Sequence, residues 1–513
     1  MRDERASLER RALELERLRR VCDDGTCEHE RNGSDNQYHG ERIVLLEAAD
    51  LVRVKRIAVT GATGFIGTAL VEALLARGDQ VIALSREGQL PASLSGVRID
   101  RLDITSRGCV AALTTALEGM DAVVHLAGET VAGHWSQAKK RRIYESRQLG
   151  TRNVVDAMHA CTTRPRTFLS ASASGYYGSR EDEPLTEDAA PGDDFLAHVC
   201  VDWEREASRA EALGIRTVRL RQGLVLGADG GALARMIPFF HAGAGGPLGS
   251  GRQWWPWIHL EDDVALMLFA IDCDACHGAV NAVSPDLTTN ARFSQALGHA
   301  MRRPSLAYAP GIALHLTLGE FSQTLLSSQL MLPVRAQDLG FTWRHESLDR
   351  ALLDILDPHS GREPRVCVFE SSEVVQASLP RVFSFFSDPA NLEALTPPAL
   401  DFRILTPRPV EMRRGCILDY QLRLRGFPLR WKTLVERWEP QTRFIDVQLR
   451  GPYLLWRHRH DFVPADGGVA VRDRVEYALP LAPLSDLALR TVAADLRRIF
   501  DYRRARLPAL LQG

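Results

Sequence analysis

A glycine-rich turn between an apolar strand and an amphipathic helix constrains this chain more than any other feature. The run 57–60 is apolar and β-branched in character, and glycines follow at Gly61, Gly64 and Gly67. The segment 68–77 then repeats apolar residues at helical intervals. Glycine is required where a turn adopts positive φ, where backbone approaches a pyrophosphate, or where a helix packs closely on a strand. The order predicts a strand–turn–helix unit whose helix N-terminus binds phosphate.

The end of the next strand indicates which dinucleotide binds. A second apolar run, 81–84, completes a βαβ pattern and is followed by Ser85 and Arg86. A site for NAD places Asp or Glu here to bind the ribose 2′-hydroxyl. A hydroxyl and a guanidinium would instead bind a 2′-phosphate, which a carboxylate would repel. The pattern predicts NADP(H); the alternative is that Arg86 is a solvated loop charge.

Strands and helices continue to alternate, which predicts a parallel, doubly wound sheet. The expected third strand is 96–102, and Asp103 follows where such folds place a carboxylate that contacts adenine, unless it caps a turn. The expected fourth strand is 121–126, and small residues after it let the backbone lie against the dinucleotide. The predicted cofactor-binding residues are Gly61, Thr63, Gly64, Phe65, Ile66, Gly67, Ser85, Arg86, Asp103, Ile104, Leu126, Ala127, Gly128 and Glu129.

Composition limits the number of domains and the class of partner. At 513 residues the chain is too long for one ordinary core, and its formal charge of −2 provides no basic field for nucleic acid or an anionic membrane. No apolar run approaches the ~20 residues of a spanning helix, so we expect a cytoplasmic protein without a signal peptide. Cys273–His277 matches a haem-attachment pattern, and Cys22 and Cys27 lie near His29, but neither has the surroundings that haem or zinc needs. We therefore expect no metal site.

Several motifs resemble the extended short-chain dehydrogenase/reductase superfamily, and further segments are similar to its epimerase-like branch, whose substrate is undefined. The superfamily motifs are 61–67, 125–128, 169–178 and 257–264. The branch-like segments are 132–147, Gly230-Gly231, 249–252 and Gly340-Phe341. The resemblance covers about residues 55–356. It implies a Rossmann domain that binds NADP(H), with a small substrate lobe built largely from segments after about residue 180.

The chain departs from that superfamily at its catalytic pair. Ordinary members use Tyr-x-x-x-Lys, in which the lysine holds the ribose and lowers the pKa of the tyrosine. Lysine occurs only at positions 55, 139, 140 and 432, never four residues after a tyrosine, and Leu196 and Cys200 take the expected positions. Ser172 or Ser174 could contact a substrate carbonyl or cap a turn. The candidate catalytic residues are Ser172, Tyr176, Tyr177 and His198.

The pattern changes class after a turn-rich linker at 357–364. A strand at 366–375, two short helices within 379–395 broken at Asp388-Pro389, and a final helix at 484–511 flank a series of strand-like runs. Those runs are 401–406, 417–424, 429–438, 443–449, 456–463 and 468–479. This order resembles the helix-grip fold of START, polyketide-cyclase and birch-pollen-allergen-like ligand carriers. The resemblance implies a sheet curled round the last helix, with an apolar cavity. The candidate wall residues, which could instead fill a core, are Trp431, Trp438, Phe444, Tyr453 and Trp456.

The expected fold class is therefore α/β, a Rossmann domain with a small substrate lobe, followed by an α+β helix-grip domain. The expected parts are a charged, partly disordered extension (1–52), the NADP-binding domain (53–356), the linker (357–364) and the ligand-binding domain (365–513). We expect an NADP(H)-dependent oxidoreductase or epimerase that acts on a carbonyl or hydroxyl of a small molecule. The rival hypothesis is a non-catalytic NADP(H) sensor that regulates ligand or partner binding. A homodimer is left open.

Overall fold

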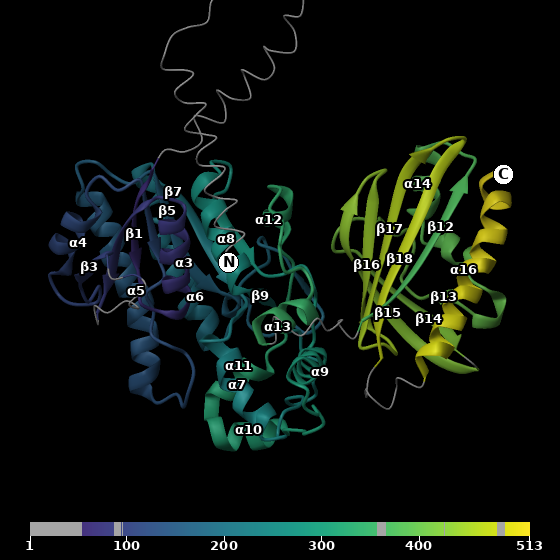
Figure 1. Ribbon diagram of the computed structural model, residues 1–513, viewed down its shortest axis with the longest axis horizontal. Coiled ribbons are helices and arrows are strands. Elements are labelled where there is room, and N and C mark those ends of the chain that lie inside the picture. Colours follow the sequence, from purple (N-terminus) through teal and green to yellow (C-terminus); the bar gives the residue numbers. More distant parts are fainter. Residues whose placement is uncertain are drawn as a thin grey trace, which may run out of the picture. The chain divides into compact units, whose positions relative to one another are not determined.

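The computed structural model describes most of the chain after residue 53, and Figure 1 shows a parallel sheet and an antiparallel sheet. The expected extension 1–52 and linker 357–364 lie outside the described residues. The described residues are 54–86, 94, 96–356, 366–424, 426–479 and 488–512. None of the helices within these ranges is long and apolar enough to cross a membrane.

Seven parallel strands form the first sheet, in the order β10-β7-β5-β4-β1-β2-β3. The strand order reverses direction between β1 and β4, and doubly wound folds bind ligands beyond the carboxyl ends of the strands at such a point. The predicted parallel, doubly wound sheet is confirmed. The strands are β1 (Arg56–Thr60), β2 (Gln80–Ser85), β3 (Arg98–Arg101), β4 (Ala122–His125), β5 (Thr167–Ala173), β7 (Arg216–Gln222) and β10 (Gly278–Ala282).

Helices cover both faces of the parallel sheet, which explains its nearly continuous apolar strands. Ile57 and Val59 of β1 belong to one core with α3 and α8, whereas Ala58 between them belongs to the opposite core with α4 and α5. Successive strand residues point to opposite faces, so β1 must be apolar on both. These helices are α3 (Phe65–Ala76), α4 (Cys109–Leu117), α5 (Gln137–Ala160) and α8 (Leu260–Asp272).

The remaining elements before residue 357 form short helices and two small strand pairs. The pairs are β6 with β11 and β8 with β9. Their bounds are β6 (Pro184–Leu185), β8 (Leu224–Leu226), β9 (Trp257–His259) and β11 (Leu330–Met331). The helices are η2 (Ser174–Tyr177), α6 (Phe195–Ser208), η3 (Glu211–Leu213), α7 (Gly231–His241), α9 (Asn290–Met301), α10 (Gly311–Leu318), η4 (Gly319–Phe321), α11 (Ser322–Leu326), α12 (Val334–Asp338) and α13 (Leu348–Leu356).

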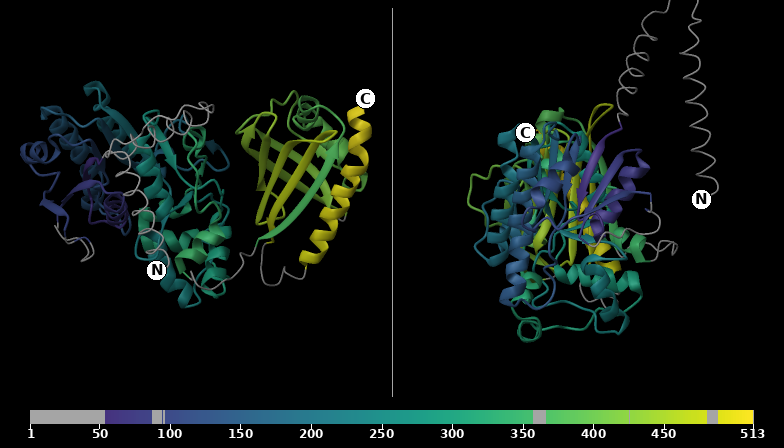
Figure 2. Two further views of the ribbon diagram at one scale, coloured as in Figure 1. Left: turned by 45° about the horizontal axis from the view of Figure 1, so that its top comes forward. Right: turned by 90° about the vertical axis from the view of Figure 1, so that its left-hand side faces the viewer.

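The C-terminal part is an antiparallel sheet in the order β12-β18-β17-β16-β15-β14-β13, with helix α16 beside it (Figure 2). Leu507 and Leu511 of α16 pack with Val471 of β18, so the apolar stripe of this helix covers the sheet. The expected helical break is present, because α14 ends at Phe386 and α15 begins after Pro389. The elements are β12 (Cys367–Val375), α14 (Leu379–Phe386), α15 (Ala390–Leu395), η5 (Pro398–Leu400), β13 (Arg403–Ile404), β14 (Ile417–Leu424), β15 (Phe427–Glu439), β16 (Arg443–Arg450), β17 (Leu455–Ala465), β18 (Gly468–Ala478) and α16 (Leu489–Gln512).

Candidate functional site

The glycine-rich turn follows β1 and brings three elements into close contact. Gly61 has a φ of +71°, and a Cβ there would lie 2.8 Å from the backbone nitrogen of Ala127. A Cβ on Gly67 would collide with the Gly61 carbonyl oxygen. The first and third glycines are thus required by the packing of β1, the end of β4 and helix α3.

The second glycine leaves the N-terminus of α3 open. Gly64 precedes the first helical residue, Phe65, and no side chain among the described residues caps this end of the helix. The first N–H groups of a helix have no partner within it, and the helix dipole makes this end positive. A phosphate group therefore fits here by the chemistry of the backbone alone. Phe65 itself packs against Gly227 and Gly230, and Ile66 packs against the core beneath the turn.

The end of β2 joins the turn through two hydroxyls. Thr63 Oγ1 and Ser85 Oγ lie 2.7 Å apart and share a hydrogen bond, which positions Ser85 beside the turn. Arg86 is exposed, and its charge acts on the end of β4. The pKa of Glu129 is lowered, first by a hydrogen bond from Lys139 and further by the charges of Arg142 and Arg86.

Asp103 stabilises a turn, which was the alternative to an adenine contact that the sequence left open. Its Oδ1 accepts hydrogen bonds from the Thr105 backbone nitrogen at 2.9 Å and the Thr105 hydroxyl at 2.7 Å. Such a side chain stabilises a turn locally. Ile104 is buried against Gly150 of α5, and its carbonyl oxygen accepts from Asn153 Nδ2 at 2.7 Å. The adenine contact of Asp103 stays a prediction.

A partly buried arginine, which the sequence analysis did not select, lies beyond β4. Arg147 of α5 donates to the Glu129 carbonyl oxygen at 2.9 Å and lies 5.0 Å from the centre of the Trp203 ring. A Cβ on Gly128 would lie 3.4 Å from its guanidinium carbon. Burial lowers the pKa of Arg147, and electrostatic interactions with Cys200 and Glu129 act in the opposite direction. Its one sequence signal is its place in the segment 132–147.

Two of the predicted catalytic residues, Ser172 and Tyr177, are parts of one buried polar network. Ser172 Oγ donates to Glu204 Oε1 at 2.7 Å, and Arg221 binds both oxygens of Glu204 at 2.8 and 2.9 Å. Arg221 also donates to the Tyr177 hydroxyl at 2.9 Å, and that hydroxyl donates to Asn281 Oδ1 at 2.7 Å. Tyr177 is fully buried, and burial raises its pKa far above the ordinary value. Neither hydroxyl is accessible, so the geometry favours a structural role for both.

The other predicted catalytic residues lie closer to solvent. Tyr176 is half-buried, with the Arg221 guanidinium carbon 3.5 Å from its ring centre, and His198 is exposed on α6. Leu196 and Cys200 face the end of β5, because a Cβ on Gly175 would lie 3.2 Å from Leu196 Cβ and 3.8 Å from Cys200 Sγ. Burial raises the pKa of the Cys200 thiol to about 12, so it is no general base at neutral pH.

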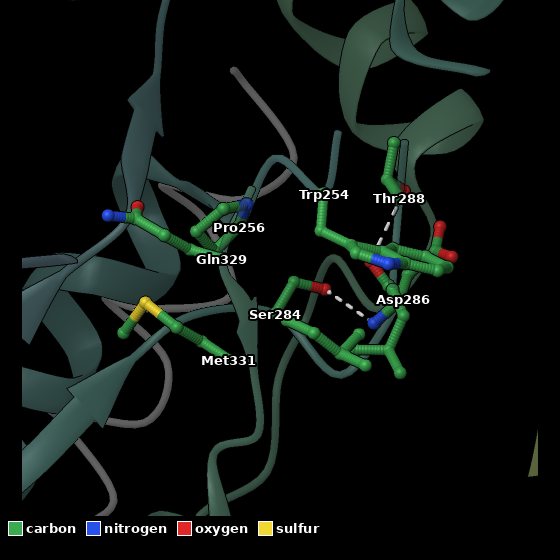
Figure 3. A pocket seen from close by; sticks show the side chains of 9 residues that line it. Trp254, Pro256, Ser284, Asp286, Thr288, Gln329 and Met331 are labelled. Atoms are coloured by element: carbon green, nitrogen blue, oxygen red, sulfur yellow. Dashed lines mark hydrogen bonds between the residues drawn. The ribbon is translucent and has the colours of Figure 1, made fainter. Parts of the chain in front are cut away.

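A small cavity between the segments 254–256, 284–288 and 329–331 cannot hold a substrate. It encloses about 10 Å³, which admits one water-sized molecule. Figure 3 shows Ser284 and Thr288 hydrogen-bonded to the backbone of Asp286 on one side, with Gln329 and Met331 on the other.

Comparisons with known proteins agree with this geometry. Residues 57–282 match the model of the NAD dependent epimerase/dehydratase family, and residues 309–355 match a domain of unknown function (DUF1731). The chain is 40% identical to the "Epimerase family protein SDR39U1 homolog, chloroplastic" of Arabidopsis thaliana over 61% of this chain and 90% of that protein. It is 35% identical to the Bacillus subtilis "Epimerase family protein YfhF" over 58% of this chain and 97% of that protein.

A solved structure shows the same likeness. The human epimerase family protein SDR39U1 (isoform 2), solved with NADPH, aligns with a TM-score of 0.54 at 31% identity. The alignment covers 59% of this chain and 99% of the human one. The matches place this chain in the epimerase family to which the Arabidopsis and Bacillus proteins are assigned.

Proposed function

We propose that the chain is an NADP(H)-dependent oxidoreductase or epimerase-like enzyme that acts on a carbonyl or hydroxyl of a small molecule. The observation that carries the proposal is the open N-terminus of α3, with Thr63, Ser85 and Arg86 beside it. The backbone would bind the pyrophosphate, and Arg86 would bind the 2′-phosphate. The human relative solved with NADPH supports this choice of cofactor. NADPH supplies a hydride when bound.

Arg147 takes over part of the role of the missing lysine in this proposal. It is a permanent cation beside Gly128, where the dinucleotide backbone contact is expected, and it acts electrostatically on Cys200 at the expected lysine position. A guanidinium holds a ribose hydroxyl or a developing negative charge as a lysine does. It does not give up a proton at neutral pH, so it cannot relay one.

The proton donor must then be a different group. Among the predicted residues, Tyr176 is the tyrosine that is not fully buried. A tyrosine that no lysine activates is a poor base at neutral pH but a usable acid. We therefore expect reduction with NADPH to be faster than oxidation with NADP.

The test is NADPH oxidation with a panel of aldehydes, ketones and quinones. We expect Arg147→Gln to lower kcat/KM by roughly 10- to 100-fold, the effect of one charge-assisted contact, and Arg147→Lys to restore part of it. Arg141→Gln is the matched control, because Arg141 lies on the same helix with an exposed side chain that pairs with Glu145. Tyr176→Phe should cut reduction by ~10² if its hydroxyl is the acid.

The rival hypothesis, a non-catalytic NADP(H) sensor, is favoured by the hydrogen bonds that already engage Ser172 and Tyr177. It predicts a protein that saturates with NADPH and reduces no carbonyl compound in the panel. NADPH binding without reduction of any carbonyl compound would therefore favour the sensor hypothesis over the enzyme hypothesis. A protein that binds neither NADPH nor NADH would contradict both hypotheses.

We further propose that the C-terminal part is a helix-grip domain that binds an apolar ligand. The support is the order of its elements and the gathering of aromatic rings on its sheet. Trp431 lies 5.1 Å from Trp456 and 5.5 Å from Tyr453 between ring centres, and Trp438 lies 5.6 Å from Phe444. Rings in mutual contact also fill a core, so tryptophan quenching by apolar ligands would test the proposal.

A further inference from the structure

Four titratable side chains meet on one face of the antiparallel sheet. Asp446 of β16 lies directly opposite His458 of β17, and His460 of β17 lies opposite Asp473 of β18. The two histidines are two residues apart on one strand, so they share a face of the sheet. His460 and Asp473 are each 4% exposed as whole residues, and the imidazole ring centres are 3.8 Å apart. The cluster is thus built by strand register.

Three of these side chains converge with the spacing of metal ligands. Asp446 Oδ1 lies 3.3 Å from His460 Nε2 and 3.8 Å from His458 Nδ1, and the three ligand atoms all lie within 4.8 Å of one another. A tetrahedral zinc site with bonds of about 2.0–2.1 Å needs ligand atoms separated by roughly 3.3 Å. Small side-chain adjustments would therefore close the three atoms round one ion.

The fourth side chain, Asp473, lies behind the histidines. His458 Nε2 forms a hydrogen bond to Asp473 Oδ1 at 3.0 Å, and Arg503 of α16 donates to the same oxygen at 3.2 Å. A carboxylate behind a ligating histidine fixes the tautomer, so that the other ring nitrogen presents its lone pair. For His458 that nitrogen is Nδ1, which faces Asp446.

The cluster is not saturated by its own contacts. His460 Nδ1 lies 2.8 Å from Asp473 Oδ1 but has no partner of good hydrogen-bond geometry among the described residues. Asp446 Oδ1 shares a long hydrogen bond of 3.3 Å with His460 Nε2, and His458 Nδ1 faces the same oxygen at 3.8 Å. An ion between these three atoms would replace that weak contact with three metal–ligand bonds.

We propose that Asp446, His458 and His460 bind one divalent transition-metal ion, with Asp473 and Arg503 as positioning residues. Two imidazoles and one carboxylate suit Zn²⁺ and its first-row neighbours, whereas Mg²⁺ and Ca²⁺ prefer oxygen ligands alone. Three protein ligands leave a position for water or a bound molecule. The proposal is independent of the function proposed for the parallel sheet.

A second group of potential ligands, His259, Glu261 and His345, is a poorer site. His259 Nδ1 accepts from the Glu261 backbone nitrogen at 3.1 Å and so caps α8. Glu261 is exposed and pairs with Arg344 at 3.0 Å, and that cation opposes a metal ion. Glu261→Gln therefore serves as the control variant.

The test uses the full-length protein, stripped with a chelator and titrated with Zn²⁺ by calorimetry and with Co²⁺ by visible absorption. We expect one equivalent to bind, with affinity at least 100-fold lower in His458→Gln, His460→Gln and Asp446→Asn. Asp473→Asn should lower it by roughly 10- to 100-fold, and Glu261→Gln should leave it unchanged. Circular dichroism and cooperative urea unfolding verify that each variant is folded.

X-ray absorption of the zinc-loaded parent protein keeps the proposal testable if the variants misfold. Two imidazole ligands at about 2.0 Å are expected. The proposal is overturned if the parent binds no stoichiometric Zn²⁺ or Co²⁺, or if the bound ion has no imidazole ligand. It is also overturned if Glu261→Gln loses the bound metal ion while the variants of Asp446, His458 and His460 keep it.

Discussion

The turn after β1 and the end of β5 belong to the same parallel sheet, yet their hydrogen-bonding groups are used in opposite ways. At the turn, the first N–H groups of α3 have no side-chain cap. At the end of β5, Ser172, Glu204, Arg221 and Tyr177 bind one another in a buried chain. Free polar groups at a strand end are available to a ligand, whereas mutually bonded ones hold the fold. Under the proposed function, the cofactor end of the site is thus open to a ligand, whereas the serine and the buried tyrosine at the other end are bonded within the protein.

The largest expected effect comes from breaking the network at β5. Arg221→Leu would leave Glu204 buried without its cation, which should lower the free energy of unfolding by about 3–5 kcal/mol. Hydrogen exchange of β5 and β7 peptides in urea measures the loss. Arg205→Gln is the control, because Arg205 forms an exposed ion pair with Asp202 and should change stability by at most about 1 kcal/mol. Equal effects of the two changes would remove the distinction between the regions.

The next effect concerns His125, which lies beneath the turn. Its ring nitrogens contact Thr60 Oγ1 at 2.7 Å and Thr151 Oγ1 at 2.9 Å, and burial lowers its pKa from 6.5 to about 4. The unfolded chain takes up a proton below pH 6.5 while the folded chain stays neutral, so stability is full above pH 6.5 and falls as the pH drops to about 4. The loss is roughly 3 kcal/mol.

The measurement is urea unfolding at pH 7 and pH 4 of the parent protein and of His125→Asn. The parent should lose roughly 3 kcal/mol more than the variant between the two pH values, because asparagine does not titrate there. An identical loss in both proteins would show that His125 is not protected from protonation.

The smallest expected effect is on the preference for NADPH over NADH. Arg86→Ala should weaken NADPH binding by about 1.5–3 kcal/mol, or roughly ten- to a hundredfold, and leave NADH binding unchanged. Fluorescence titration with both cofactors measures this. If the parent protein bound NADPH and NADH equally well, the assignment of Ser85 and Arg86 to the 2′-phosphate would fail.

Much of the fold could be predicted because it depends on near neighbours in the chain. Apolar runs, helical periodicity and glycine spacing predicted β1, α3 and β2, and the observed bounds differ from those expected by one to three residues. The break between α14 and α15 follows from Pro389 in the same way. The final helix begins at Leu489 in the structure, and part of its expected start, 484–487, lies outside the described residues.

The candidate site was less predictable, because its contacts join residues far apart in sequence. Nothing local to Tyr177 indicates that Arg221 and Asn281 surround its hydroxyl. Arg147 carries no motif of its own that marks it as a neighbour of Gly128. The pattern His458-Arg459-His460 was available in the sequence, but its meaning depends on Asp446 and Asp473 of the adjacent strands.

The amino-acid sequence by itself determined most of the strands, turns and helices, and that a glycine-rich strand–turn–helix unit opens the parallel sheet, because these follow from φ preference and side-chain periodicity. Only the tertiary structure decided which polar groups are engaged and which are free. Strand register and helix packing bring Ser172 to Glu204, Arg147 to Gly128 and His460 to Asp473. A side chain's chemistry is set by such neighbours, since burial and hydrogen bonding control its charge and its availability to a ligand.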